Sequence, residues 1–317
     1  MEVVWWILGI AAALAVICLI TSFICFMMVF RAPKRRVLGE NEYEIPEGDI
    51  YEVFRDEMVG WIKSIRNMPH EDVSITSFDG LTLRGKYYEQ NNGAPIEIMF
   101  HGYKGNAERD LCGAVERAFS VGRNALIVDQ RGSGRSDGNV ITFGINERRD
   151  CLSWIDFAIN KFGADTKIMI TGISMGAATV MMASGEELPT NVIGTLADCG
   201  YTSAKEIIKK VITEMKLPAD ILYPFVKLGA RIFGRFDLEE TSPLEAMNNC
   251  KVPVIFVHGD DDAFVPYDMS VHLHEACASD KKILITIKGA GHGLAYPVDK
   301  EGYINQLCAL NEEWSLK

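Results

Sequence analysis

One serine of this chain stands in a pattern that could make it a nucleophile. Ser174 lies between two glycines in Gly-Ile-Ser-Met-Gly (172–176), after the apolar run Lys-Ile-Met-Ile and before a segment of helical composition. Between a strand and a helix, this pattern makes a tight turn, the nucleophile elbow, that exposes the serine hydroxyl. The N-terminal end of the helix also directs its positive pole at the site. The flanking strand and helix favour this interpretation over a plain glycine turn.

A serine hydroxyl needs a base that removes its proton, and the chain has six histidines. His292 follows the last strand pattern, in Lys-Gly-Ala-Gly-His-Gly (288–293), where a loop can bring the imidazole over the serine. His101 and His258 each precede a glycine at the end of a predicted strand. The others are assigned to a connector and to a surface helix: His70, His272 and His274. His292 is therefore the predicted base.

The base in turn needs a carboxylate that orients it. Three adjacent aspartates, Asp260, Asp261 and Asp262, follow the strand pattern Pro253–Val257. The residues alone do not choose among them. The order serine, aspartate, histidine along the chain is that of proteins with a nucleophile elbow.

An acyl-transfer transition state also needs hydrogen-bond donors for its oxyanion. One is expected to be the backbone N–H of Met175, directly after the serine. The second is expected from the loop His-Gly-Tyr-Lys-Gly-Asn (101–106), with the N–H of Tyr103 as the candidate. His101 is then a residue that shapes the loop.

The elements that must position these groups alternate between strand and helix patterns. A hairpin is predicted around Asp79-Gly80, because apolar and polar residues alternate on both sides. The further strands are predicted at Ile96–Phe100, Ala125–Asp129, Lys167–Thr171, Val192–Asp198, Pro253–Gly259 and Lys281–Lys288, and helices at 106–121, 146–161, 175–184 and a last one to about 314. This alternation predicts an α/β fold: a mostly parallel sheet of about eight strands with helices on both faces. Residues 200–248 interrupt the rhythm and are interpreted as a small helical cap over the C-terminal edge of the sheet.

The N-terminal segment Val3–Phe30 contains 28 residues without a charge. A membrane-spanning helix needs about 20 apolar residues, and the long run without a cleavage site favours an uncleaved single-pass anchor over a signal peptide. Four of the next six residues are basic, in Arg-Ala-Pro-Lys-Arg-Arg (31–36). The positive-inside tendency then predicts a membrane protein whose C-terminal bulk faces the cytoplasm.

Residues 37–72 are interpreted as an amphipathic connector, followed by the main domain at 73–317. Apolar residues recur at helical spacing and predict one helix that contains Ile50, Val53, Phe54, Met58, Trp61, Ile62 and Ile65. Packing against the main domain is favoured over a position on the membrane surface. The anchor and its basic flank occupy residues 1–36.

Charge and cysteine usage exclude several classes of protein. The net charge of −11 argues against nucleic-acid binding through phosphates. The eight cysteines form no CxxC pair and no repeated spacing, so a disulfide framework and a zinc site are not expected.

The chain resembles the α/β-hydrolase superfamily, most closely the branch with Bem46-like proteins, cinnamoyl and feruloyl esterases, monoacylglycerol lipases and S33-type serine aminopeptidases. The resemblance runs from about Val73 to Trp314 and rests on HGYKGN, DQRGSGRSDG, GISMGA, DCGYTS, HGDDDAFVP and GAGHG, in the family's order. The family's H-G-x-x-D pattern implies Asp262 as the acid. The family often has histidine where this chain has Ser133, in a loop-shaping segment. Serine at position 174 separates the chain from the epoxide and haloalkane hydrolases, which use aspartate.

These patterns predict a membrane-anchored serine hydrolase that cleaves an acyl ester or thioester without metal or organic cofactor. The catalytic residues are Ser174, His292 and Asp262, with Tyr103 and Met175 at the oxyanion hole. The apolar cap and the anchor suggest a small-molecule or lipid substrate with an apolar part. Two alternatives remain: an S33-type peptidase, in which a cap carboxylate grips the substrate amine, and a catalytically idle membrane-tethered scaffold. Oligomeric state stays open.

Overall fold

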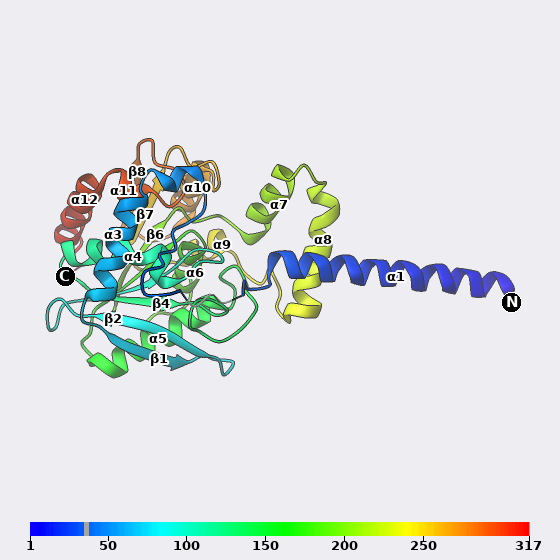
Figure 1. Cartoon of the computed structure of the whole chain (residues 1–317), viewed down its shortest axis with the longest axis horizontal. Helices are drawn as coiled ribbons and strands as arrows, with labels where there is room; N and C mark the ends of the chain where they lie inside the picture. Colours follow the sequence, from blue (N-terminus) through cyan, green and yellow to red (C-terminus); the bar gives the residue numbers. More distant parts are fainter. Residues whose placement is uncertain (35–37, 317) are drawn as a thin grey trace.

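The computed structural model describes residues 1–34 and 38–316. The strands are β1 Glu71–Thr76, β2 Thr82–Tyr88, β3 Ile96–Phe100, β4 Asn124–Asp129, β5 Ile168–Ile173, β6 Val192–Asp198, β7 Val254–Gly259 and β8 Lys282–Ile287. The helices are α1 Glu2–Val29, α2 Asp49–Glu52, α3 Arg55–Asn67, α4 Ala107–Ser120, α5 Glu147–Phe162, α6 Met175–Ser184, α7 Ala204–Glu214, α8 Ala219–Gly229, the π-helix η1 Ala230–Gly234, α9 Pro243–Met247, α10 Tyr267–Ala276, α11 Ala295–Val298 and α12 Lys300–Glu313. Figure 1 shows a globular α/β body from which α1 projects on one side.

The described residues contain one eight-stranded sheet in the order β1-β2-β4-β3-β5-β6-β7-β8. The β1–β2 hairpin is antiparallel, β2 pairs antiparallel with β4, and the strands from β4 to β8 pair in parallel. The central strands β3 and β4 are buried along their whole length, because helices cover both faces of a parallel sheet. The predicted fold class is confirmed.

Two sets of helices form the outer layers of this sandwich. On one face, α4 and α12 pack on the sheet, and α3 of the connector packs on the outside of α4. On the other face, α5, α6 and α10 cover the sheet. The loops at the C-terminal ends of β3, β5, β7 and β8 meet at one edge of the sheet, where ligands bind in folds of this kind.

The connector forms two helices, and the prediction of one helix is wrong. α2 ends at Glu52, and Phe54 leaves helical geometry before α3 begins. Met58, Trp61, Ile62 and Ile65 are buried as the periodicity predicts, but Ile50 and Val53 are half or more exposed. The helical spacing of apolar residues therefore continues across a point where the backbone is not helical.

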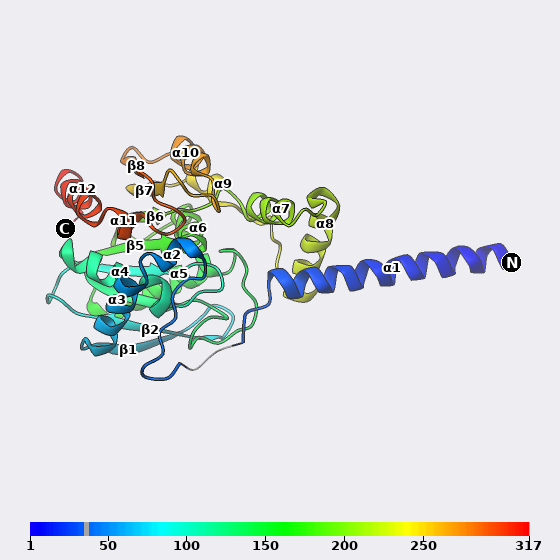
Figure 2. The ribbon, with the colours of Figure 1, turned by 45° about the horizontal axis from the view of Figure 1, so that its top comes forward.

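Residues 200–248 contain α7, α8, η1 and α9. Figures 1 and 2 show α7 and α8 beside the globular body, next to the C-terminal part of α1. Phe26 and Phe30 of the α1 end are buried in one apolar cluster with Tyr223, Val226 and Phe236 of the cap. The same cluster contains Phe143, Met175 and Val265, which follow β4, β5 and β7, so the cap lies on the side of the C-terminal edge of the sheet, and α8 packs mainly on α1.

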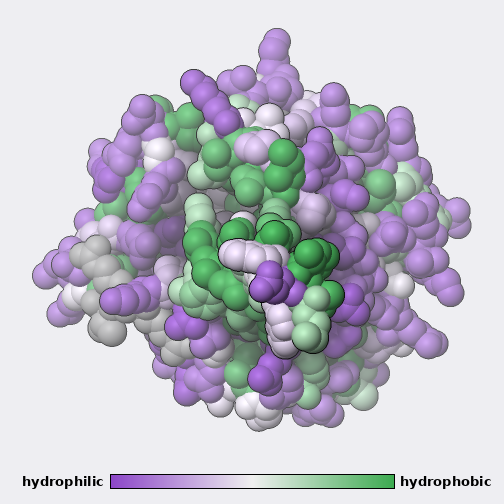
Figure 3. All heavy atoms as spheres, turned by 90° about the vertical axis from the view of Figure 1, so that its right-hand side faces the viewer, coloured by the Kyte–Doolittle hydropathy of each residue, from purple (hydrophilic) through white to green (hydrophobic). Residues whose placement is uncertain are grey.

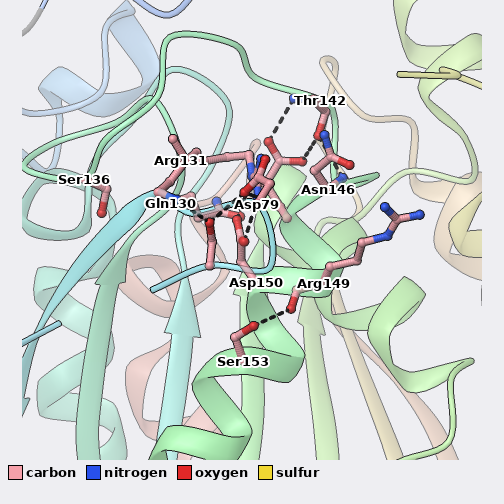
Figure 4. A network of polar contacts seen from close by, with 12 residues as sticks. Asp79, Gln130, Arg131, Ser136, Thr142, Asn146, Arg149, Asp150 and Ser153 are labelled. Atoms are coloured by element: carbon pink, nitrogen blue, oxygen red, sulfur yellow. Dashed lines mark hydrogen bonds and ion pairs between the residues drawn. The ribbon is translucent and has the colours of Figure 1, made fainter. Parts of the chain in front are cut away.

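A buried polar network holds the β1–β2 turn and the loop after β4 together (Figure 4). The guanidinium of Arg131 donates to both carboxyl oxygens of Asp150 at 2.7 Å and also to Asp79 in the hairpin turn at 2.9 Å. Burial raises the pKa of Asp150 to about 6, although Arg131 opposes that shift. Nearby, Glu147 accepts hydrogen bonds from the backbone N–H groups of Thr142 and Gly144. The network fixes the loop that precedes α5.

Candidate active site

Ser174 occupies a sharp turn between β5 and α6. Its backbone has φ 56° and ψ −115°, a strained conformation that persists only where the surroundings enforce it. A Cβ atom added to Gly176 would lie 1.9 Å from the carbonyl oxygen of Phe100, and one on Gly172 would lie 2.0 Å from the carbonyl carbon of Gly176. Only glycine fits at these two positions, which explains the motif on either side of the serine.

The structure brings the three predicted catalytic side chains together. The Oγ of Ser174 lies 2.9 Å from Nε2 of His292, and Nδ1 of His292 lies 2.8 Å from Oδ2 of Asp262. Ser174 comes from the end of β5, Asp262 from the loop after β7 and His292 from the loop after β8. The distances are those of a nucleophile, a base and an orienting carboxylate.

Of the three adjacent aspartates, only Asp262 is buried. Its Oδ1 accepts the backbone N–H groups of Phe264 and Val265 at 2.9 and 2.8 Å. Burial alone would raise its pKa, but hydrogen bonds from His258 and His292 hold the pKa well below the usual carboxyl range. Asp262 is therefore an ionised partner for the imidazole.

His258 is a site residue to which the sequence assigned no role. It is fully buried, and its Nε2 lies 3.1 Å from Asp262 Oδ2 and 2.9 Å from the carbonyl oxygen of Val265. Its Nδ1 lies 2.5 Å from the hydroxyl of Ser270. The spacing of His258 and Asp262 in the H-G-x-x-D pattern was the available signal. His258 positions the carboxylate and does not reach the serine.

The loop after β3 approaches Ser174 closely. A Cβ on Gly102 would lie 3.6 Å from the Ser174 Cβ, and the N–H of Gly102 is bound by Asp110 at 3.0 Å. His101 is buried and uses both ring nitrogens, toward the carbonyl of Gly102 and the N–H of Gln130. Burial lowers the pKa of His101. These contacts fit the expected loop-shaping role of His101 and leave Tyr103 at the mouth of the site.

A cavity of about 270 Å³ opens beside Ser174 and His292. Its lining includes Tyr51, Met58 and Trp61 from the connector and further residues from α4. Among the described residues, none from 200–248 lines it. The connector, not the cap, therefore shapes this pocket.

Tyr51 is a second site residue that sequence reasoning missed. Its hydroxyl donates to the backbone carbonyl of His292 at 2.9 Å, across 241 positions of sequence. Burial raises the pKa of the Tyr51 phenol, so this donor stays protonated at ordinary pH. The short helix α2 thus supports the loop that carries the base, and no local sequence signal indicates such a long-range contact.

One set of possible metal ligands among the described residues coincides with the site: Cys199, Asp262 and His292. Burial raises the pKa of the Cys199 thiol well above its usual value, whereas a metal requires the thiolate. Asp262 and His292 are also directed at each other. The donor set fits a proton-transfer group better than a metal site.

The chain is similar to several known proteins. No family model matches the chain. An uncharacterized protein YqkD of Bacillus subtilis strain 168 is 26% identical over 242 residues, covering 76% of this chain and 79% of the relative. Protein bem46 of Schizosaccharomyces pombe is 26% identical over 223 residues, 68% of each chain. Among solved structures, the Pyrococcus furiosus esterase Pf2001 superposes with a TM-score of 0.65 at 21% identity, covering 90% of this chain and 99% of the esterase.

The sheet order, the serine elbow and these likenesses together define the class of protein. The chain has the α/β-hydrolase fold, and its similarity to protein bem46 supports membership of the α/β-hydrolase superfamily. Its bem46 relative and its esterase neighbour support a hydrolase.

Proposed function

We propose that the protein is a membrane-anchored serine hydrolase that cleaves a carboxylic ester or thioester. The observation that carries the proposal is the continuous chain of contacts from Ser174 Oγ through His292 to Asp262, at 2.9 and 2.8 Å. Such a chain allows a serine to lose its proton as it attacks a carbonyl carbon.

In the proposed mechanism, Ser174 attacks the acyl carbonyl while Nε2 of His292 takes its proton. His292 then returns that proton to the leaving group, which departs and leaves an acyl-serine ester. Asp262 stabilises the imidazolium and fixes the tautomer with hydrogen on Nδ1. The N–H groups of Tyr103 and Met175 are the proposed oxyanion donors. Water activated by His292 then releases the acid and restores the serine.

The apolar side chains of the pocket support an acyl ester as the substrate. Its walls carry several apolar side chains, among them Met58, Leu111 and Leu196, and its volume suits an acyl or aryl group of moderate size. The cap carboxylates considered for gripping an amine do not line it. Asp220 and Glu239 instead form ion pairs on the cap surface, with Lys209 and Lys227.

Helix α1 supports the anchor in this proposal. Its 28 residues form one apolar helix, long enough to cross a membrane, and the side chains of its N-terminal two thirds are largely exposed. Two basic residues of the flank, Arg35 and Arg36, lie outside the described residues. The cytoplasmic orientation therefore remains a proposal drawn from the charge pattern.

The test uses the full chain in lipid nanodiscs beside its Ser174→Ala variant. Both are assayed with p-nitrophenyl esters of increasing acyl length, with an acyl-thioester and with aminoacyl-anilides. Ester turnover that is lost in the variant, together with labelling of the wild type alone by a fluorophosphonate, is the expected result. Faster turnover of the anilides would assign a peptidase. A folded wild-type protein that neither turns over nor becomes labelled would leave the scaffold alternative.

A further inference from the structure

The cap contains a helix whose buried and exposed faces are both apolar. The inner face of α8 buries Tyr223, Val226 and Gly229. The opposite side carries a stripe at helical spacing that continues into η1: Ile221, Phe225, Leu228 and Ile232. The two isoleucines are 63% and 43% exposed. We call these four residues the outer stripe. A soluble surface helix presents polar residues on that side.

The outer stripe lies where α1 leaves the globular body. A Cβ on Gly229 would lie 2.4 Å from the carbonyl oxygen of Ser22, so the two helix backbones touch there. Phe23 and Phe26 of α1 contact Phe233 of η1, with ring centroids 5.1 and 5.8 Å apart. Both ribbon views show α8 crossing α1 at a steep angle (Figures 1 and 2). A membrane crossed by α1 therefore runs roughly along α8.

The length of α1 sets the depth of α8 in such a membrane. About 20 residues of helix, from Glu2 to Thr21, span about 30 Å, the thickness of the hydrocarbon core. The remaining turns, Ser22 to Val29, reach into the headgroup layer, and their free side is still apolar, with Ile24 and Met28 more than half exposed. Lipid that covers these two side chains also reaches the neighbouring α8.

The surroundings of the outer stripe match a bilayer surface. Met215 and Leu217, before α8, are also exposed and apolar. Figure 3, which looks along α1, shows apolar side chains gathered around α1. Exposed basic residues lie beside them, namely Lys216, Arg231 and Arg235. An apolar stripe with basic neighbours is the pattern of helices that lie in the membrane interface, and basic residues strengthen the attraction to an anionic surface.

We infer that α8 and η1 form a second membrane contact, in which the outer stripe enters the boundary between headgroups and acyl chains. This inference rests on the proposed anchor. The cap then gives the globular body a second point of attachment to the bilayer. The structure thereby assigns a role to the cap, which does not wall the pocket beside Ser174.

The test places a photo-crosslinking benzoylphenylalanine at one position at a time in the full chain, in nanodiscs of phosphatidylcholine with phosphatidylglycerol. Ile221 and Ile232 report on the outer stripe, Leu14 on the anchor, and Val298, an exposed valine of α11, is the matched control. The expected result is lipid adducts by mass spectrometry at Leu14, Ile221 and Ile232 and none at Val298.

The outcomes separate this inference from the proposed function. Adducts at Leu14 without adducts at the outer stripe would overturn the second membrane contact and keep the anchor. Protein–protein crosslinks at Ile221 or Ile232 would also overturn it and assign the stripe to a second copy. The absence of adducts at Leu14 would overturn the anchor and the inference together. None of these readouts depends on hydrolase activity.

Discussion

The hydroxyl of Tyr103 donates a hydrogen bond to the backbone carbonyl of Val29 at 2.6 Å. Next to it, the ammonium of Lys104 donates to the carbonyl of Met28 at 3.0 Å. The last carbonyls of a helix have no partner within the helix, so the loop after β3 completes the end of α1. The same loop carries the proposed oxyanion donor, so helix α1 and the candidate active site share a contact.

This contact predicts that Tyr103→Phe weakens catalysis although the backbone donor remains. Loss of one hydrogen bond of about 1 kcal/mol lowers stability by that amount and kcat by up to about fivefold, because the loop that carries the proposed oxyanion donor loses a support. Steady-state kinetics and thermal unfolding check this. Tyr267→Phe, which removes a hydroxyl bonded to Thr286 on the surface, should leave kcat unchanged. An equal loss of kcat in both variants would contradict the coupling.

Removal of the Tyr51 hydroxyl should slow the enzyme through its base. Tyr51→Phe frees the carbonyl of His292, and we expect kcat to fall by about three- to tenfold, the equivalent of one hydrogen bond. Tyr43→Phe, in the same connector, is the control, because the Tyr43 ring is held by stacking with Arg66. Matched decreases in the two variants would show a general effect of the connector and not a positioning role.

The carboxylate of Asp262 should be far more important than its neighbours. Asp262→Asn is expected to lower kcat by about 10⁴, as loss of the orienting carboxylate does in serine proteases, whereas Asp261→Asn alters an exposed residue and should have no effect. The lowered pKa of Asp262 means that its contacts contribute stability above its ordinary pKa of 3.8 and lose it only as the pH falls through the lower folded value. The stability gap between wild type and Asp262→Asn should therefore persist at mildly acidic pH, as measured by thermal unfolding.

The elbow glycines should tolerate no side chain. Gly176→Ala places a Cβ 1.9 Å from a backbone oxygen, and the overpacking should cost about 3 kcal/mol or more and reduce the yield of folded protein. Gly60→Ala is the matched control: it lies in α3, where an added Cβ meets nothing within 4 Å, and it should stabilise the chain by up to about 1 kcal/mol. Denaturant unfolding distinguishes the two. A Gly176→Ala protein of normal stability would contradict the described elbow.

Mutation of Asp198, at the end of β6, should increase the stability of the protein, and the increase should depend on pH. Burial raises its pKa from 3.8 to about 6, so ionisation of the buried carboxyl at neutral pH costs up to about 3 kcal/mol. The folded state binds the proton more tightly, and its stability falls as the pH rises between these values. Asp198→Asn keeps an acceptor for the hydroxyl of Tyr303, which lies 3.2 Å from Oδ2, and should raise Tm at neutral pH but not near pH 4. A gain that is independent of pH would point to packing instead.

The sequence predicted the sheet because each strand pattern was separated from the next by helix-length segments. It also predicted which side chains meet, since Ser174, Asp262 and His292 each follow a strand and parallel strands end at one edge. The hairpin and all eight strands lie within a few residues of the expected positions. Local periodicity and strand order carry that information.

The contacts that no local pattern encodes were missed or misplaced. Tyr51 of α2 contacts His292 across 241 positions of sequence, and the adjacent α3 packs on α4, although each of these two amphipathic helices could have found another partner. The cap was expected over the C-terminal edge of the sheet, but no local pattern indicated that it packs on Phe26 and Phe30 of α1. The H-G-x-x-D motif contains His258, but the motif does not indicate that His258 is buried and hydrogen-bonded to Asp262.

Aromatic side chains join the end of α1 to the globular body, so the folded unit begins within α1. Phe30 is fully buried, and its ring lies 5.2 Å from Phe236 and 5.9 Å from Phe143, while its carbonyl accepts the N–H of Ile141 at 2.8 Å. Proteolytic cleavage in the basic flank would therefore not release a soluble domain. The end of α1 would either stay packed in the globular body or, on leaving it, expose an aromatic surface. The globular body can be separated from α1 only if it loses the part of its core that α1 supplies.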